Sequence, residues 1–270
     1  GCGKSTLAGC INGLNPCSNP GEATGELIID GVDATKSSIF ELSAHVGTVL
    51  QDPDGQFIGL TVGEDIAFSL ENSCMPQDEM HQITRKVAEL VKINNHLDYA
   101  PHELSGGQKQ RVAMARMLAA EPEVLLLDEP FAAIDAKVRQ ELRTWLRETI
   151  DKIGITSIFV THDQDEAIEV ADEIIITNEG RVEQMGDPVE IYLHPKTPFV
   201  AQFIGESAVI TDYDRLKGFH LYPGCSRAII RPEFVKAVRY GTEKRYQSLY
   251  AEGIVEQKSR GHCIPSVCGG

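Results

Sequence analysis

Residues 104–129 read LSGGQKQRVAMARMLAAEPEVLLLDE, and this stretch decides the fold. Its apolar run Val124–Leu127 predicts a buried strand over Val124–Asp128, and residues 107–120 before it are expected to form a helix. Two carboxylates, Asp128 and Glu129, stand at the end of this strand. Parallel sheets present polar groups to ligands at the carboxyl ends of their strands. The stretch therefore predicts a ligand site at the edge of an α/β sheet.

Strands and helices are expected to alternate along much of the chain. The patterns predict strands at 46–50, 156–161 and 173–177, and helices at 4–14, 137–153 and 164–171. This alternation is typical of βαβ units and implies a parallel sheet. Apolar residues recur at helical spacing within 77–93, which predicts a helical subdomain. Residues 26–33, with Asp30-Gly31 at their centre, predict a peripheral hairpin.

The chain of 270 residues is long enough for one large α/β domain and a smaller second domain. After Gly205 the sequence changes to short β-prone pieces separated by Gly, Pro and polar turns. We expect an α/β domain over 1–205 and a partial, small β-barrel domain over 206–270. Because Gly1 already lies inside a motif and no closing strand precedes Gly270, both ends are expected to be truncated.

Composition narrows the classes of function. The formal net charge is −15, which argues against a surface built to hold nucleic acid, because phosphate backbones bind clustered Lys and Arg. No apolar run approaches the roughly 20 residues needed to cross a bilayer. The 7 cysteines form no CxxC pair, so we expect free thiols in a reducing compartment.

The first six residues predict a phosphate site. They are Gly1, Cys2, Gly3, Lys4, Ser5 and Thr6, and they fit the end of the pattern G-x-x-x-x-G-K-[ST] and the threonine after it. Small residues let backbone N–H groups wrap phosphates, Lys4 neutralises β- and γ-phosphate oxygens, and Ser5 offers a hydroxyl to Mg²⁺. The first glycine of the pattern would precede residue 1, so a chance glycine turn is the alternative.

The carboxylates after the predicted strand complete this chemistry. In a nucleotide site, Asp128 would hold Mg²⁺ through its water shell, and Glu129 would polarise the attacking water as general base. The alternative is a strand end whose carboxylates are only solvated.

A second anion site is predicted at Ser105-Gly106-Gly107-Gln108. The two glycines expose backbone donors beside Ser105 where the helix begins. One nucleotide does not need two phosphate binders from the same chain, so we expect two chains to exchange these elements across two ATP molecules as a dimer. A simple capped helix turn is the alternative.

Taken in order, these motifs resemble the ABC ATPase family from Gly1 to about Gly205. The resemblance implies an ABC-type P-loop NTPase that uses ATP and Mg²⁺. It also implies that Gln51 contacts Mg²⁺ and responds to a membrane subunit, that His162 contacts the γ-phosphate, and that Asp135 lies at the contact between ATPase subunits. Outside that family, Gln51 would be an ordinary loop residue and His162 a structural histidine.

The two halves of the chain resemble different branches of the family. Residues 45–72, which include QDPDGQ at 51–56, are similar to ATPases of energy-coupling-factor importers for vitamins and metal ions. From Val112 onward, stretches such as FVTHDQDEA at 159–167 look like the sulfate/thiosulfate import ATPases. The change falls near 104–111, where recombination or a misassembled gene would join the two patterns, and natural divergence is the alternative.

The resemblance implies ATP hydrolysis that powers solute import, with sulfate or thiosulfate favoured because the second half carries the accessory domain. An energy-coupling-factor importer is the alternative, and a soluble ABC ATPase is a distant one. A nucleotide-locked subunit is disfavoured because Glu129 and His162 are both present. The implied partners are a second ATPase subunit, transmembrane permease subunits and, indirectly, an extracytoplasmic binding protein. The implied location is the cytoplasmic face of the membrane.

Overall fold

The computed structural model describes residues 3–19, 21–22, 24–52, 54–132 and 134–205. Beyond residue 205 it describes the backbone of short strands, which are β8 (Ala208–Ile210), β9 (Leu216–Lys217), β10 (Ala228–Ile230), β11 (Val235–Lys236), β12 (Ser248–Ala251) and β13 (Val255–Lys258). The described residues up to 170 form one compact unit, and residues from 171 onward form a second. Each unit is described by itself below.

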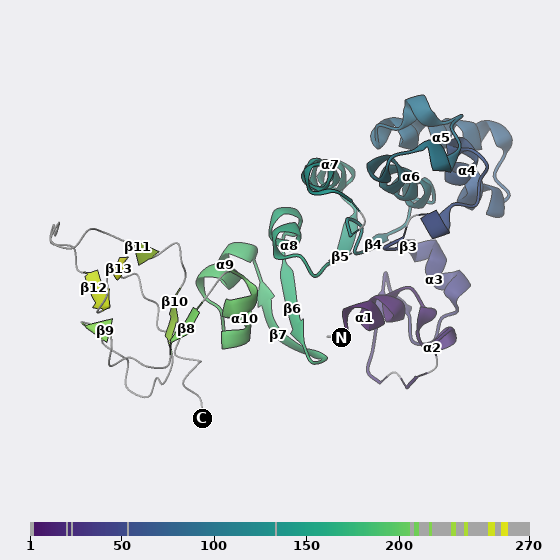
Figure 1. Cartoon of the computed structure of the whole chain (residues 1–270). Helices are drawn as coiled ribbons and strands as arrows, with labels where there is room; N and C mark the ends of the chain where they lie inside the picture. Colours follow the sequence, from purple (N-terminus) through teal and green to yellow (C-terminus); the bar gives the residue numbers. More distant parts are fainter. Residues whose placement is uncertain are drawn as a thin grey trace. The chain divides into compact units, whose positions relative to one another are not determined.

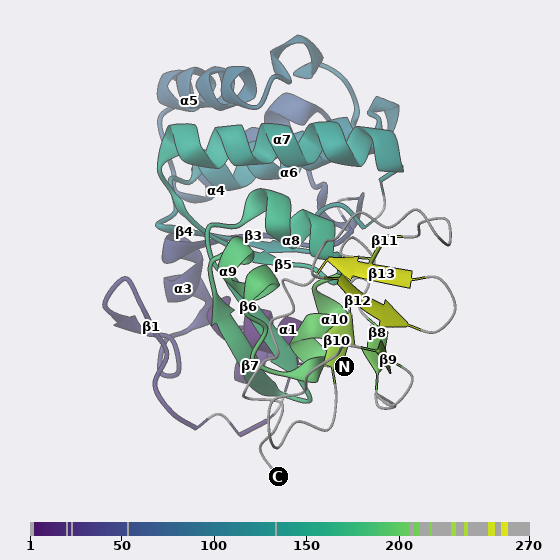
Figure 2. The same ribbon diagram turned by 90° about the vertical axis from the view of Figure 1, so that its left-hand side faces the viewer.

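The centre of the first unit is a parallel sheet, as the sequence predicts. Its strands are β3 (Val46–Val49), β4 (Val124–Asp128) and β5 (Thr156–Val160), in the order β3-β4-β5. The register pairs Val49 with Leu127 and Asp128 with Val160, so the carboxyl ends of the three strands lie at one edge. Figures 1 and 2 show helices on both sides of this sheet.

One face of the sheet is covered by the N-terminal elements α1 (Lys4–Ile11), α2 (Leu14–Cys17), β1 (Ile28–Ile29), β2 (Val32–Asp33) and α3 (Ile39–His45). Leu126 of β4 packs here among Ala8, Ile11 and Leu42. The expected hairpin is confirmed, since β1 and β2 pair antiparallel across Asp30-Gly31. The expected helix at 4–14 was too long, because Gly13 adopts the left-handed φ of 78° and separates α1 from α2.

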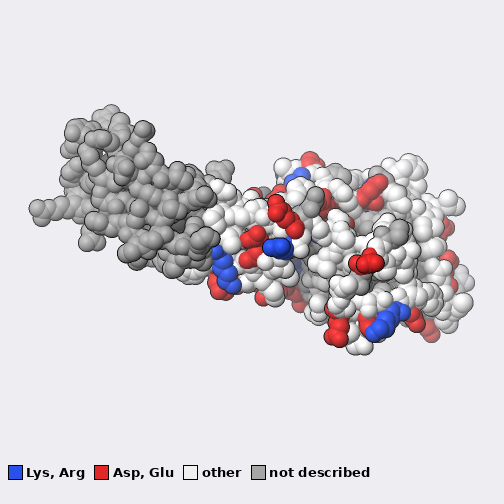
Figure 3. Space-filling view, turned by 90° about the horizontal axis from the view of Figure 1, so that it is seen from below, with Lys and Arg blue, Asp and Glu red and all other residues white. Residues whose placement is uncertain are grey.

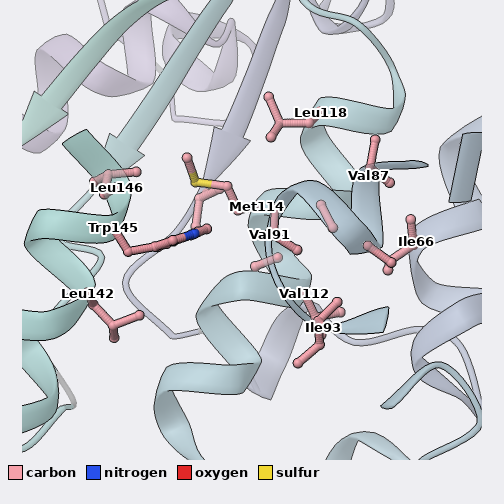
Figure 4. Close-up of a cluster of buried hydrophobic side chains, with 14 of the residues drawn as sticks. Ile66, Val87, Val91, Ile93, Val112, Met114, Leu118, Leu142, Trp145 and Leu146 are labelled. Carbon is pink, nitrogen blue, oxygen red and sulfur yellow. The ribbon is translucent and has the colours of Figure 1, made fainter. Parts of the chain in front are cut away.

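The other face carries a helical layer, which we define as α4 (Val62–Asn72), α5 (Gln77–Leu90), α6 (Gly106–Ala119) and α7 (Ala136–Ile153). Leu125 and Leu127 of β4 point into it, because successive strand side chains alternate between faces. Figure 4 shows Trp145 of α7 reaching toward Met114 of α6 inside this core. The predicted helical subdomain is therefore present. Three 3-10 turns, η1 (Asp54–Gln56), η2 (Asn94–His96) and η3 (Pro101–Glu103), and the helix α8 (Gln164–Val170) complete the unit.

The second unit begins with β6 (Ile174–Asn178), β7 (Arg181–Gly186), α9 (Pro188–Leu193) and α10 (Pro198–Phe203). The sequence placed the strand correctly but predicted the wrong pairing, because β6 pairs antiparallel with β7 in a two-stranded sheet. Glu179 and Gly180 have φ of 48° and 77°, so they form a tight two-residue turn that returns the chain beside β6.

The expected barrel domain over 206–270 falls almost wholly outside the described residues. Among the short strands there, β8 pairs with β10, and β11, β13, β12 and β9 form a four-stranded sheet. The division at residues 205 and 206 stays a prediction.

Acidic and basic side chains are interspersed on the one face seen in Figure 3, where Lys and Arg stand singly among Asp and Glu. Within the part of the chain that the structure describes, no helix is both long and apolar enough to span a membrane. Cys10, Cys17 and Cys74 are free thiols, as expected for these three.

Candidate functional site

Three predicted site residues follow the three parallel strands at one edge. Gln51 lies two residues beyond the end of β3, Glu129 follows β4, and His162 lies two residues beyond the end of β5. Because the register pairs Val49 with Leu127 and Asp128 with Val160, these ends coincide. We call this region, with Asp128, the sheet edge. The sequence placed Asp128 and Glu129 at a strand end, and the register now brings Gln51 and His162 to the same edge. The role of each residue stays a prediction.

Asp128 is the last residue of β4 and is half-buried. Its Oδ1 is buried and has no hydrogen-bond partner among the residues that the structure describes. Burial raises the pKa of this carboxyl, neighbouring Glu129 raises it further, and Lys4 opposes both. An unsatisfied buried carboxylate oxygen near a lysine fits a cation that shares the site with phosphates.

Glu129 adopts a left-handed backbone conformation with φ of 47°, which costs a non-glycine residue on the order of 1 kcal/mol. Its N–H donates to the carbonyl oxygen of Val160 at 2.8 Å, so the strained residue is anchored to β5. Its side-chain Oε1 lies 3.2 Å from Nδ1 of His162. The Glu129 side chain is 22% exposed and that of His162 is 68% exposed, so the pair opens to solvent. The arrangement suits a base beside a proton donor.

A small cavity opens beside this pair, with a volume of about 50 Å³. It is lined by Glu129, Ala132, Arg139, Thr161, His162, Asp163 and Glu166. Of these, the sequence singled out only Glu129 and His162. Arg139 comes from α7 and Glu166 from α8, and their convergence depends on how those helices pack.

The predicted phosphate loop enters α1 at the sheet. Gly3 precedes α1 with φ of 85°, and α1 packs against β4 and β5. Lys4 is close enough to Asp128 to lower the pKa of that carboxyl. Ser5 and Thr6 are exposed in the first turn of α1, where a ligand has access. Gly1 and Cys2 lie outside the described residues.

The set predicted to hold Mg²⁺ is Ser5, Gln51 and Asp128, which supplies a hydroxyl, an amide and a carboxylate. Hard oxygen ligands of this kind suit Mg²⁺, which keeps several waters and takes few protein ligands. No cluster of three or more His, Cys, Asp or Glu side chains that could hold a metal occurs among the described residues. The buried Oδ1 of Asp128, which has no hydrogen-bond partner among the described residues, is the feature that suits a bound Mg²⁺.

The Gln51 loop is held in place by Gln56. The Gln56 amide donates to the carbonyl oxygens of Leu50 at 3.2 Å and Asp52 at 3.0 Å, the two residues that flank Gln51. Arg116 on α6 donates to the side chain of Gln56 at 3.1 Å and to its backbone oxygen. The sequence did not single out Gln56 or Arg116.

The Ser105–Gln108 segment begins α6 on the sheet face opposite α1. Ser105 N–H donates to Gln108 Oε1 at 2.8 Å, and Gln108 N–H donates to Ser105 Oγ at 3.4 Å. Gln108 Nε2 also lies 3.0 Å from Nε2 of His96. These side chains are occupied by one another, so what the start of α6 offers a ligand is the N–H groups of Gly106 and Gly107, which lack intrahelical acceptors. The two predicted phosphate binders of one chain therefore lie on opposite sheet faces.

Asp135 is the N-cap of α7, and its side chain accepts from Val138 N–H at 3.2 Å. It is exposed. The structure thus gives Asp135 a capping role, and its predicted contact with a second subunit stays a prediction.

Comparison with known proteins extends these observations. The family model described as ABC transporter matches residues 1–132. The sulfate/thiosulfate import ATP-binding protein CysA of Thermosynechococcus vestitus is 49% identical over 210 residues, covering 78% of this chain and 60% of the relative. The protein of the same name from Gloeobacter violaceus is 44% identical over 229 residues, covering 85% of this chain and 63% of the relative. The chain thus spans about 60% of the length of such relatives.

A solved structure gives the second comparison. It is that of cbiO1 from Clostridium perfringens, part of the ABC transporter complex cbiONQ. It superposes with a TM-score of 0.65 at 35% identity and covers 71% of this chain and 75% of its own.

Proposed function

Because the chain belongs to the ATP-binding family of ABC transporters, we propose that it hydrolyses ATP at the sheet edge and that this reaction powers solute import. The observation that carries the proposal is the pairing of Glu129 with His162 at 3.2 Å, beside the unsatisfied oxygen of Asp128. The predicted general base and the predicted phosphate contact lie within reach of one another.

The chain's own groups divide the work. Lys4 neutralises β- and γ-phosphate oxygens, with Ser5 and Thr6 beside it in the first turn of α1. Glu129 accepts the proton of the attacking water, and His162 donates to the γ-phosphate. Ser5, Gln51 and Asp128 would hold Mg²⁺, which would supply positive charge to offset the charge that develops on the phosphates. The start of α6 serves the ATP bound by a second ATPase subunit.

Glu129→Gln tests the assignment. It keeps the size of the side chain but removes the base, so we expect phosphate release to fall at least about 100-fold. ATP binding, measured with a fluorescent analogue, should persist. Glu148→Gln, at an exposed position on α7, is the matched control and should hydrolyse ATP normally. Equal turnover by Glu129→Gln and the unchanged protein would refute the catalytic assignment.

For the cargo, we propose sulfate or thiosulfate, with permease subunits and a binding protein as partners. The support is the identity of 44–49% to proteins with that printed activity. The second candidate is an energy-coupling-factor importer, which the likeness to cbiO1 and the sequence of residues 45–72 favour. Expression in a strain that lacks its sulfate import ATPase should restore uptake of labelled sulfate, and Glu129→Gln should not. Restoration only in a strain lacking an energy-coupling-factor ATPase would select the second candidate.

A further inference from the structure

His162 is exposed, so its side chain depends on the backbone beneath it for its position. It makes the 3.2 Å contact with Glu129 although 68% of its side chain is open to solvent. Side chains this exposed are free to change rotamer unless the local backbone directs them. The position of His162 therefore depends on the contacts of the residues on either side of it.

Thr161, immediately before His162, is held by its hydroxyl. The Thr161 hydroxyl donates to Oε2 of Glu166 at 2.6 Å and accepts from the N–H of Asp163 at 3.0 Å. It therefore bridges the Glu166 carboxylate to the peptide group that follows His162. Glu166 is only 4% exposed, so this is a fixed internal contact.

Asp163, immediately after His162, is held by α7 and by the start of α8. Its Oδ1 accepts from the N–H groups of Asp165 and Glu166 at the start of α8. Its Oδ2 lies 3.5 Å from Nη1 of Arg139, which also lies 3.9 Å from Glu166. The residues on both sides of His162 are thus tied to one pair, Arg139 and Glu166.

Arg139 also reaches the segment before α7. Its Nη2 donates to the carbonyl oxygen of Ile134 at 3.0 Å. Ile134 directly precedes Asp135, the residue expected at the contact between ATPase subunits. The planar guanidinium can hold the carbonyl and the carboxylates at once because its donors point in fixed, divergent directions.

We propose that Arg139 and Glu166 are positioning residues for His162, and that the Arg139–Ile134 contact links His162 to the segment that carries Asp135. This inference rests on the proposed function. A movement of Ile134 on subunit contact would reach His162 through one arginine. The competing explanation is that Arg139 only neutralises a buried glutamate. That explanation predicts lost stability, with no effect that depends on His162.

Two changes separate these explanations. Thr161→Val removes the bridging hydroxyl with little change of shape, whereas Thr161→Ser keeps it. Arg139→Lys keeps a cation near Asp163 and Glu166 but cannot also reach Ile134. The matched control is Arg143→Lys, one turn along α7, where Arg143 pairs with Glu169 at 3.1 Å. Thermal unfolding checks that each variant is folded. If Thr161→Val does not fold, Arg139→Lys tests the proposal in its place.

Small misplacements of catalytic groups cost on the order of 100-fold in rate, so a partial loss of positioning should lower kcat at least about tenfold. We expect this for Thr161→Val and Arg139→Lys, with the KM for ATP changed less than about twofold. Thr161→Ser and Arg143→Lys should stay within about twofold of the unchanged protein. In a His162→Ala background, the first two substitutions should cause no further loss.

A second measurement covers the case in which the residual rate of His162→Ala is too low to compare. The NMR resonances of the His162 ring should shift in Thr161→Val and Arg139→Lys, and not in Arg143→Lys. Losses of equal size with and without His162, or an unmoved ring signal, would overturn the inference while leaving ATP hydrolysis intact. An unchanged protein that hydrolyses no ATP would overturn both proposals.

Discussion

Two carboxylates of the first unit have buried oxygen atoms but differ in whether those atoms have hydrogen-bond partners. Asp65 on α4, in the helical layer, is fully buried; its Oδ1 accepts from Ile58 N–H at 2.8 Å and Gly59 N–H at 3.3 Å. Its Oδ2 lies 3.4 Å from Arg116. Asp128, at the sheet edge, has a buried oxygen with no partner among the described residues. The first carboxylate is satisfied within the fold, and the second is the one proposed to meet a ligand.

The difference explains why one residue type can stabilise one region and strain the other. A buried charge is tolerable when a counter-ion and hydrogen bonds compensate it, and otherwise it costs free energy. The helical layer includes that compensation in α6. At the sheet edge the compensation is proposed to come with Mg²⁺ and ATP, so in their absence the fold bears the cost. Removing a charged group should therefore change the stability in opposite directions in the two regions: it should destabilise the helical layer and stabilise the sheet edge.

The largest effect is expected from Arg116→Ala in the helical layer. It leaves Asp65 buried without its counter-ion and frees Gln56, so the free energy of unfolding should fall by about 3–5 kcal/mol. Urea unfolding at neutral pH measures this. Arg85→Ala, at an exposed position on α5, is the control and should change stability by no more than about 0.5 kcal/mol. A cost under about 1 kcal/mol for Arg116→Ala would show that Asp65 does not depend on the arginine.

Alanine substitutions at the two glycines at the start of α6 should have a smaller effect on stability. They also separate a role in the fold from a role in ATP turnover. A Cβ at Gly107 would lie 3.0 Å from Val138 Cγ1 and 3.3 Å from Leu142 Cδ1. Gly107→Ala should therefore destabilise the protein by about 1–3 kcal/mol through overpacking against α7. At Gly106 the nearest atom would be 3.9 Å away, which is ordinary contact.

Gly106→Ala is accordingly expected to leave the thermal unfolding midpoint nearly unchanged and to lower ATP turnover. The added methyl would stand beside the N–H groups proposed to meet the partner subunit's nucleotide. Melting curves and phosphate release, measured on both variants, test the division. If Gly106→Ala turned over ATP normally, the start of α6 would be a capped helix and no more.

Sequence reasoning succeeded where the signal is local. β4 has the predicted bounds Val124–Asp128, since an apolar run between polar residues suffices to define a buried strand. Ser105 and Gln108 stand at capping-box spacing, so the four residues 105–108 are enough to predict where α6 begins. The sheet edge was also predictable, because parallel strands bring their carboxyl ends together wherever the helices between them go.

What could not be predicted depends on packing between distant segments. Arg139 and Asp163 are 24 residues apart, and Arg116 and Asp65 are 51 apart. The spacing of apolar residues in the sequence does not predict such pairs. The clue was the one arginine within the apolar stretch VAMARMLA at 112–119, which needs a buried counter-ion when it faces the core. The predicted pairing of β6 was wrong for a different reason. In the sequence, Glu179-Gly180 looks like an ordinary loop, and only its φ values show a tight turn.

A small effect of opposite sign on stability is expected at Asp128. Its pKa is raised above the ordinary value of 3.8, chiefly by burial and also by Glu129, while Lys4 opposes the shift. A raised pKa means that the folded protein holds the proton more tightly than the unfolded chain does. The stability contributed by this group is therefore complete below the ordinary pKa and is lost as the pH rises through the folded-state value.

Asp128→Asn removes that loss, because asparagine does not ionise. The variant should be slightly more stable than the unchanged protein at neutral pH, and the two should converge as the pH falls toward 3.8. Urea unfolding over a pH series measures the difference. Asp98→Asn, at an exposed position, controls for the loss of one charge. The same Asp128 variant should lose Mg²⁺-dependent ATP turnover. A variant that was less stable at neutral pH would mean that the Asp128 carboxylate supports the fold, as Asp65 does, and the contrast between the two regions would fail.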